Sequence, residues 1–515
     1  MTHREVLEAL SGLLIAMFVA MLSSTVVSNA LPRIVADLEG SESGYTWVVV
    51  ATLLTLTATT PIWGKLADLF SKKALVQISL LIFLAGSVIA GTAPSMGVLI
   101  GARAVQGVGV GGLTALVQIV IATIVSPRER GRYFGYLGAV FAIATVSGPL
   151  VGGLIVDTSW LGWRWTFFVG VPFAALAFFV LQKTLHVPTV KRRVSIDYLG
   201  ALLISSGVSI LLIWVSLAGS RFEWKSLTTA WMVTLGVAAL IAFVFVEGRV
   251  KEPIIPLRLF RDRTTSLAVF ASVMVGVAMF GATVFLSQYF QIARGMSPTR
   301  AGLMSLAMVL GLLVSGIATG RVISATGRWK RYLVGGSILM VAGLALLSTI
   351  DATMSLVEVG AFMAVLGIGV GAVNQNLVLA VQNNAAQADM GAASSLAAFF
   401  RTMGGSIGVS ALGTALSHQV STKVLEGLSR LGIQPTGEGS GTSIPDLSKL
   451  PAPVREVFQT AFAEGTGHIF LLATPFAVLA FVAILMIREV PLRTTIERAD
   501  ELEPSRRTDV EAVGA

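Results

Sequence analysis

The feature that most constrains this sequence is a succession of apolar runs, each long enough to cross the hydrocarbon core of a bilayer as a helix of about 20 residues. We identify fourteen such runs, at residues 10–32, 46–66, 74–94, 97–122, 134–156, 164–184, 198–217, 229–247, 265–291, 301–324, 332–351, 354–381, 393–417 and 467–488. Only 13% of the 515 residues are charged, too few to cover the surface of a water-soluble protein of this length. Because a backbone in lipid must satisfy its own hydrogen bonds, we predict an all-α polytopic membrane protein.

The net charge and the content of Cys and His limit which kinds of binding site the chain can contain. The net charge of +9 comes from Lys and Arg gathered in loops, which favours membrane orientation over binding of nucleic acid. The absence of Cys excludes disulfides, iron–sulfur clusters and thiolate metal sites, and the four His form no ligand-spaced pair. We therefore expect no cofactor, no metal and no nucleic-acid partner. The run at 10–32 is too long for a signal-peptide core and lacks a cleavage site, so we expect it to be retained as the first span.

The loops between the runs differ in their content of basic residues. One alternate set is rich in them, with Lys65, Lys72, Lys73, Arg128, Arg130, Arg132, Lys191, Arg192, Arg193, Arg258, Arg261, Arg263, Arg328, Lys330 and Arg331. The other set is poorer. The positive-inside rule therefore places the rich set and both termini in the cytoplasm, and we expect a multi-pass protein of the plasma membrane. One loop of the inner set, at 381–394, breaks this pattern because it contains no Lys or Arg.

An internal repeat suggests how the spans are organised. The stretch "GKLADLFSKK" at 64–73 follows the second run, and "GRVISATGRWK" at 320–330 lies in a later inner loop. If the two runs within 191–263 are set aside, each copy follows the second helix of a six-helix half, which gives halves at 1–190 and 264–490 and a tail at 491–515. The connection at 418–466 is expected outside, with a short amphipathic helix at 453–465, and could be a spacer, a lid or a substrate gate.

Two stretches contain charged residues at notable positions, one at the end of a run and one inside the membrane boundary. In "GKLADLFSKK", Asp68 with Lys72 and Lys73 follows Gly64, and this carboxylate could cap a helix of the opposite half, whereas the simpler interpretation is a positive-inside turn. Arg328 belongs to the second copy. In "ARAVQGVGVGG", Arg103 lies inside the membrane boundary, where an arginine is either functional or held by carbonyls of neighbouring helices.

Together with these stretches, two more carry a resemblance to the major facilitator superfamily, in its fourteen-span drug:proton antiporter branch. They are "LSSTVVSNALP" at 22–32 and the antiporter motif Gly148-Pro149-Leu150-Val151-Gly152-Gly153. The resemblance implies two pseudo-symmetric six-helix bundles plus two extra helices. It also implies that Arg103 and Gln106 influence proton binding, and that the antiporter motif marks an exporter. Glycine on one face and a bend at proline would make that motif a tight seam where the halves rock, or simply a small-residue contact.

The chain departs from the family in the residue that would carry the proton. Ser23 stands where the family has an aspartate, and Ser71 where it prefers glycine. Glu358 is our candidate for a replacement carrier, with a plain interfacial carboxylate as the alternative. Arg401, about eight residues into its run, could pair with an acid, contact an anionic substrate group or bind carbonyls.

Polar residues in apolar runs are candidates to line a substrate pocket. They are Ser23, Asn29, Gln118, Gln288, Gln291, Asn374, Gln375 and Asn376, each of which could instead bond between helices. We predict a secondary active exporter of amphipathic small molecules, a monomer that exchanges them for protons by alternating access between its halves. The alternatives are a lipid or secreted-metabolite exporter and, remotely, a membrane-embedded enzyme, although no paired nucleophile and base and no Walker A sequence is present.

Overall fold

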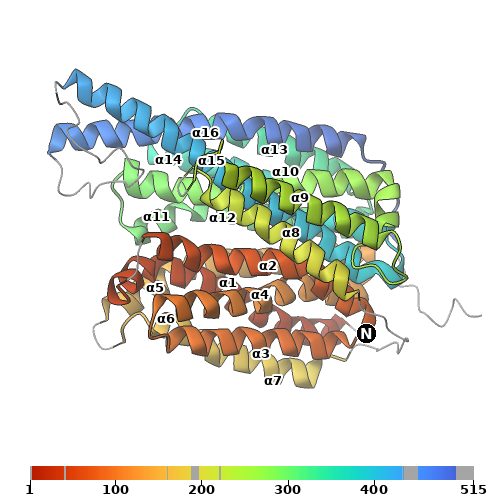
Figure 1. Ribbon diagram of the computed structural model, residues 1–515. Coiled ribbons are helices and arrows are strands. Elements are labelled where there is room, and N and C mark those ends of the chain that lie inside the picture. The colour runs from red at the N-terminus through yellow and green to blue at the C-terminus, as the bar shows by residue number, and fades with distance from the viewer. Residues whose placement is uncertain are drawn as a thin grey trace, which may run out of the picture.

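Long helices, most of them running along one common axis, make up the chain in the computed structural model (Figure 1). The structure describes residues 3–39, 42–158, 161–186, 197–219, 222–431, 433 and 451–493. Within these residues, 13 helices are long and apolar enough to span a membrane. A further helix, α15, holds the predicted run at 393–417, so the predicted all-helical class and number of spans agree with the structure.

The first helix group, α1–α7, forms one side of the bundle (Figure 1). Its members are α1 (His3–Asp37), α2 (Glu42–Leu69), α3 (Lys72–Gly91), α4 (Met96–Ile124), α5 (Pro127–Asp157), α6 (Trp165–Phe168) and α7 (Val171–Thr184). The single run predicted at 164–184 is divided between α6 and α7. Pro172, which lacks a backbone donor, lies in the first turn of α7, a position that tolerates it.

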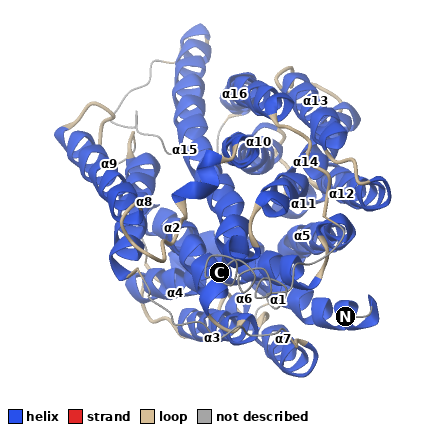
Figure 2. Cartoon of the chain, turned by 90° about the vertical axis from the view of Figure 1, so that its right-hand side faces the viewer, coloured by secondary structure: helices blue, strands red, loops and turns tan. Residues whose placement is uncertain are grey.

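The second helix group, α10–α16, forms the other side. It contains η1 (Leu257–Arg261), α10 (Arg263–Gln288), the π-helical η2 (Tyr289–Ala293), α11 (Pro298–Met304), α12 (Leu306–Thr326), α13 (Lys330–Leu347), α14 (Leu356–Asn384), η3 (Gln387–Asp389), α15 (Met390–Arg430) and α16 (Ala452–Met486). Between the groups in sequence lie α8 (Tyr198–Leu217) and α9 (Leu227–Glu247), which pack on each other, with α8 also against α2 and α15 (Figure 2).

The same neighbour relations occur in both groups. Helix α1 packs on α5, α2 on α4 and α3 on α4, and correspondingly α10 packs on α15, α12 on α14 and α13 on α14. The contacts between the groups also come in a matching pair, because α2 packs on α15 and α5 packs on α12. This correspondence is the expected consequence of two repeated six-helix units facing each other.

The connection predicted at 418–466 is mostly helical. Helix α15 continues to Arg430 and α16 begins at Ala452, so the amphipathic stretch at 453–465 is the first part of a long helix. The two helices project together from the bundle (Figure 1), with Lys423 paired to Glu464. The amphipathic pattern extends the apolar spans without a break, which is why the boundaries predicted from apolar runs alone were wrong here.

Both described ends of the chain lie at the same end of the bundle, which we call the basic end. There the amide of Arg128, in the first turn of α5, donates to the carbonyl of Arg493, which follows α16, at 3.3 Å. The indole of Trp329 donates to the carbonyl of Val490 at 2.8 Å, which fixes the start of α13 to the same segment. Apart from residues 491–493, the predicted tail lies outside the described residues, as do Lys191, Arg192 and Arg193.

Candidate functional site

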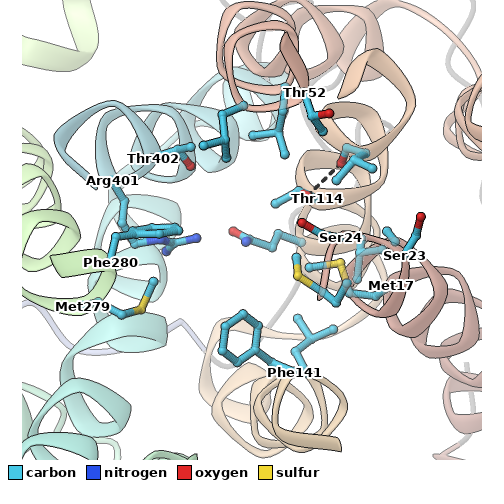
Figure 3. Close-up of a pocket in the computed structure, with 18 of the residues that line it drawn as sticks. Met17, Ser23, Ser24, Thr52, Thr114, Phe141, Met279, Phe280, Arg401 and Thr402 are labelled. Atoms are coloured by element: carbon cyan, nitrogen blue, oxygen red, sulfur yellow. Dashed lines mark hydrogen bonds between the residues drawn. The ribbon is translucent and has the colours of Figure 1, made fainter. Parts of the chain in front are cut away.

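A cavity of about 190 Å³ lies between the two helix groups (Figure 3). The first group contributes residues from α1, α2, α3, α4 and α5, and the second from α10, α12, α14 and α15. The polar lining residues are Ser23, Ser24, Thr52, Arg103, Gln106, Thr114, Gln118, Asn374, Gln375, Arg401 and Thr402. In Figure 3, Arg401 and Phe280 reach into the cavity from one wall and Ser24 from the opposite wall. A ligand here would therefore touch both groups at once.

Arg103 is held rigidly on the α4 side of the cavity. Its side chain is buried, and Nε donates to the Val48 carbonyl of α2 at 3.4 Å. Its Nη1 donates to Gln106 Oε1 at 2.8 Å, one helical turn away, and the Gln106 amide donates to Ser87 Oγ of α3 at 2.8 Å. From the sequence, Arg103 could have a functional role or could be held by carbonyls. The structure contains one hydrogen bond to a backbone carbonyl and an arginine–glutamine pair that lines the cavity.

Arg401 is positioned by a tight crossing of α10 and α15. A Cβ at Gly276 would lie 2.1 Å from the Arg401 carbonyl oxygen, so glycine is required for this approach. The guanidinium is buried and its Nη1 donates to Asn374 Oδ1 of α14 at 2.7 Å. The described partner of Arg401 is thus a side-chain amide, rather than the acid or the backbone carbonyls that the sequence suggested.

Three lining residues have a buried oxygen with no hydrogen-bond partner among the described residues. These atoms are Ser23 Oγ, Gln118 Oε1 and Gln375 Oε1. A buried polar atom left unpaired costs about 1–3 kcal/mol, so such atoms mark places where a ligand or water can bind. Ser23, which stands where the family has an aspartate, is therefore a neutral lining residue.

The predicted pocket residues are divided by the structure. Ser23, Gln118, Asn374 and Gln375 line the cavity. Gln291, in η2, donates to Ser287 Oγ at 3.0 Å, and neither it nor Gln288 contributes to the lining, while Asn376 bonds to the Ala372 carbonyl of its own helix. The side chain of Asn29 lies outside the described residues.

At the basic end, a carboxylate of the first group caps a helix of the second. Asp68 accepts hydrogen bonds from the backbone amides of Gly391 and Ala392, at 2.7 and 2.9 Å, in the first turn of α15. A Cβ at Gly64 would lie 2.9 Å from the Gly391 carbonyl oxygen, so α2 and α15 approach closely at this point. Both bonds place a negative charge at the positive end of a helix dipole.

The second copy of the repeat makes the corresponding crossing with different chemistry. A Cβ at Gly320 of α12 would lie 2.0 Å from the Gly131 carbonyl oxygen of α5. Ser324 takes the place of the carboxylate, and Arg128 of α5 instead donates to the carbonyls of Ser324 and Ala325, at 3.0 and 2.8 Å. Arg128 is thus a bridging residue that the sequence analysis assigned only to membrane orientation.

The other basic residues predicted for this latch do not bridge the groups in the described contacts. Lys73 donates to the Gln182 carbonyl of α7, within the first group, at 2.6 Å. Lys72 is half-buried in the first turn of α3, and Arg328 is exposed in the turn after α12. Of the residues predicted for the latch, Asp68 therefore bridges the two groups in the described contacts, and Lys72 and Lys73 do not.

The antiporter motif packs within the first group. A Cβ at Gly148 would lie 2.1 Å from Thr25 Oγ1 of α1, and that hydroxyl donates to the Ala144 carbonyl of α5 at 3.3 Å. Gly152 is buried on the same helix, and the surroundings of Pro149 and Gly153 lie outside what the structure describes. The expectation that this motif forms the seam between the halves needs correction, because α5 meets α12 through other glycines, near its start.

Glu358 lies outside the cavity. It is exposed in the first turn of α14, where its carboxylate accepts from the Ser355 amide at 3.2 Å in a capping box. This corresponds to the alternative of an interfacial carboxylate. No carboxylate occurs among the described residues that line the cavity.

Several lining residues were missed because single polar residues were sought instead of helical faces. Met17, Met21 and Ser24 repeat at intervals of four and three on α1. Arg103, Gln106, Val110, Thr114 and Val117 form the corresponding face of α4. Extending the helical period from Arg103 would have found the α4 face, whereas the α1 face is offset from Ser23 and does not follow from that residue.

Comparisons with known proteins agree with this arrangement. Residues 13–409 match the family model described as Major Facilitator Superfamily. An uncharacterized MFS-type transporter of Mycobacterium tuberculosis is 36% identical over 494 residues, which cover 96% of this chain and 71% of that protein. The multidrug transporter protein MdtP of Bacillus subtilis is 33% identical over 443 residues, covering 86% and 78%. In fold, the human organic anion transporter MFSD10 (TETRAN) matches with a TM-score of 0.59 and 12% identity, over 91% of this chain and 99% of that one.

Proposed function

Because this chain belongs to the Major Facilitator Superfamily, we propose that it is a secondary active exporter of amphipathic small molecules. Its relatives include a protein named a multidrug transporter, which supports an efflux role. The moving halves would be residues 1–190 and 264–490, with α8 and α9 as an added pair. We place the protein in the plasma membrane as a monomer, with both termini and the basic end in the cytoplasm.

The observation that carries this proposal is a cavity walled by both helix groups and closed at the basic end. The lining residues come from both sides, while Asp68 and Arg128 join the groups through backbone contacts at that end. These few polar bonds would break as the groups rock, which would open the cavity toward the basic end, on the cytoplasmic side of the membrane. Alternating access requires such a site and such a removable closure.

We further propose exchange with protons as the coupling reaction. The resemblance to drug:proton antiporters supports it, and Arg103, bound to Gln106 beside the cavity, provides a fixed positive charge that would influence a nearby proton site. Ser23 cannot carry a proton as the family aspartate would, so the coupling requires a direct test.

The test uses everted membrane vesicles from a host that expresses the chain, with vesicles lacking it as the control. Three dansyl probes of similar size are added: dansylglycine, its neutral amide and the amine dansylcadaverine. Protein-dependent accumulation of at least one probe is expected when the vesicle interior is acidified, together with its loss when an ionophore collapses the pH gradient. If accumulation persists without the gradient, proton exchange is wrong. If no probe accumulates above the control, the exporter proposal is wrong.

A further inference from the structure

The cavity carries positive charge without a balancing acid. Arg103 and Arg401 both line it, and an arginine stays protonated at any physiological pH. The described lining contains no Asp or Glu, and the described ion pairs involve neither arginine. Two buried cations therefore face one volume, an arrangement that is costly unless an anion occupies it.

The two guanidinium groups differ in how strongly they are already engaged. Arg103 is bound to Val48 and Gln106, and Gln106 is in turn fixed by Ser87. Arg401 has one described side-chain partner, the Asn374 amide, although a guanidinium offers five donors. Arg401 also reaches into the cavity beside Phe280 (Figure 3). Arg401 therefore uses one of its five donors in the described contacts and Arg103 two, and Arg401 is held by fewer neighbours when a ligand approaches.

The other lining residues indicate what the rest of such a ligand, beyond its anionic group, would consist of. Met17, Met21, Phe141, Met279 and Phe280 provide an apolar and adaptable surface. The unpartnered amide oxygens of Gln118 and Gln375 are acceptors and would bind a hydroxyl or amide donor. The lining therefore fits a molecule that combines an anionic group, a hydrogen-bond donor and an apolar body.

We propose that the cavity selects amphipathic organic anions over neutral and cationic analogues, and that Arg401 binds the anionic group directly. This inference rests on the exporter proposal and adds the charge class of its substrate. Arg103 contributes to the positive potential but stays bound to its own neighbours. A carboxylate or sulfonate would meet Arg401 through charge-assisted hydrogen bonds while its apolar part packs on Phe280 and the methionines.

The experiment measures binding and transport with the same three dansyl probes, which share a fluorophore and differ in charge. The purified full chain in lipid nanodiscs is titrated with each probe, and initial rates are measured in everted vesicles. We expect dansylglycine to bind about tenfold or more tightly than its neutral amide, the ratio expected for one hydrogen bond to a charged group. We expect dansylcadaverine to bind most weakly.

Four variants test which residue determines the selectivity. Arg401→Gln should abolish the preference for dansylglycine while leaving binding of the neutral amide, and Arg401→Lys should retain part of it. Arg300→Gln, which removes an exposed arginine outside the cavity, should leave the ranking as in the parent. Ser23→Asp, which places a carboxylate in the lining, should weaken the binding of dansylglycine and strengthen the binding of dansylcadaverine.

The outcomes are separable. If the parent binds the neutral or cationic probe as tightly as the anion, the inference is overturned while export of the other probes still supports the exporter proposal. If Arg401→Gln weakens all three probes equally, Arg401 is structural and its assigned role is wrong. Should Arg401→Gln not fold, the parent ranking and the Ser23→Asp variant still decide. If no probe is bound or moved, the exporter proposal itself fails.

Discussion

Arg103 shows how a charged residue is kept inside a membrane protein by amides and carbonyls. Its replacement by Ala would leave Gln106 Oε1 without this donor, at about 1–3 kcal/mol for a buried group left unpaired, whereas the Val48 carbonyl still accepts from Thr52 Oγ1 at 3.5 Å. We therefore expect Arg103→Ala to lower the initial rate of probe export by about tenfold or more, and to lower the melting temperature of the purified protein. Arg103→Lys should restore part of both, since it keeps the charge.

Glu358 provides a matching variant outside the cavity. Because Gln also serves in a capping box, Glu358→Gln should keep the start of α14 intact and change the export rate by less than about twofold. The rate is measured in the same vesicle assay. A large loss with preserved stability would instead return Glu358 to the coupling role considered from the sequence.

Much of the site could be predicted at the level of single residues. Arg103, Arg401, Ser23 and Gln118 stand out because polar groups are expensive in apolar runs, and all four line the cavity. The same rule also selected Gln288 and Gln291, because it ignores which way a helix face points. The direction of Gln291 depends on the π-helical turn at Tyr289–Ala293, whose register the sequence pattern does not reveal.

At the scale of elements, the glycines of α5 and α12 control how closely the two groups approach. A Cβ at Gly320 would fall 2.0 Å from a backbone oxygen, which cannot move aside as a flexible side chain can. We expect Gly320→Ala to separate the helices and lower stability by about 1–3 kcal/mol, the usual cost of overpacking. Thermal unfolding of the purified protein measures this, with export rates alongside.

Gly335 is the matched control for that substitution. It is exposed on α13 and a Cβ there would meet nothing within 4 Å. Because Ala favours a helix by about 1 kcal/mol over Gly, Gly335→Ala should leave stability unchanged or raise it. Equal melting temperatures for the two variants would contradict the close approach of α5 and α12.

The start of α10 depends on one carboxylate. Asp262 accepts from the Thr265 amide at 2.7 Å and from the Asn384 side chain at 2.9 Å, which joins α10 to the end of α14. Partial burial alone would raise the pKa of Asp262, but the hydrogen bonds from Asn384 and Thr265 outweigh it and hold the pKa below its ordinary value of 3.8. We expect Asp262→Ala to cost about 1 kcal/mol, as for other helix caps.

The lowered pKa also fixes the sign of a pH dependence. A carboxylate with a depressed folded pKa stabilises above its unfolded pKa, and this contribution is lost as the pH falls through the folded value. The difference in melting temperature between the parent and Asp262→Asn should therefore be largest at neutral pH, and should shrink as the pH falls below the ordinary value of 3.8 and through the lowered folded pKa. A difference that stays constant with pH would show that the charge of Asp262 contributes nothing.

The elements themselves were largely predictable, because apolar length determines a span and basic loops determine its direction. The errors occurred where length was not set by the bilayer. Helices α15 and α16 continue past their apolar parts as a paired extension, held by contacts such as that of Gly427 with Val457. The polar composition of that stretch suggested a loop. The contacts between the two helices, which stabilise the extension, cannot be recognised from the sequence of either helix alone.

At the scale of the whole molecule, rocking of the two groups should appear as a change of distance at the basic end. The sequence contains no Cys, so spin labels attach only where Cys is introduced. Phe70, directly after α2, and Ala388, in η3 before α15, are both exposed and flank the bonds from Gly391 and Ala392 to Asp68. Labels at Phe70→Cys and Ala388→Cys should give a predominantly short distance by double electron–electron resonance.

Adding Asp68→Asn to this doubly labelled protein should populate a second, longer distance. The substitution removes the charge that strengthens two bonds to the first turn of α15, and a loss of about 1.4 kcal/mol shifts the closed and open populations tenfold. Asp351→Asn is the control, because Asp351 also accepts two backbone amides but follows α13 at the opposite end of the bundle. If Asp68→Asn and Asp351→Asn give the same distance distribution as the parent, the bonds of Asp68 do not hold the basic end closed. A longer distance in Asp68→Asn alone would identify this contact as the closure that alternating access must break.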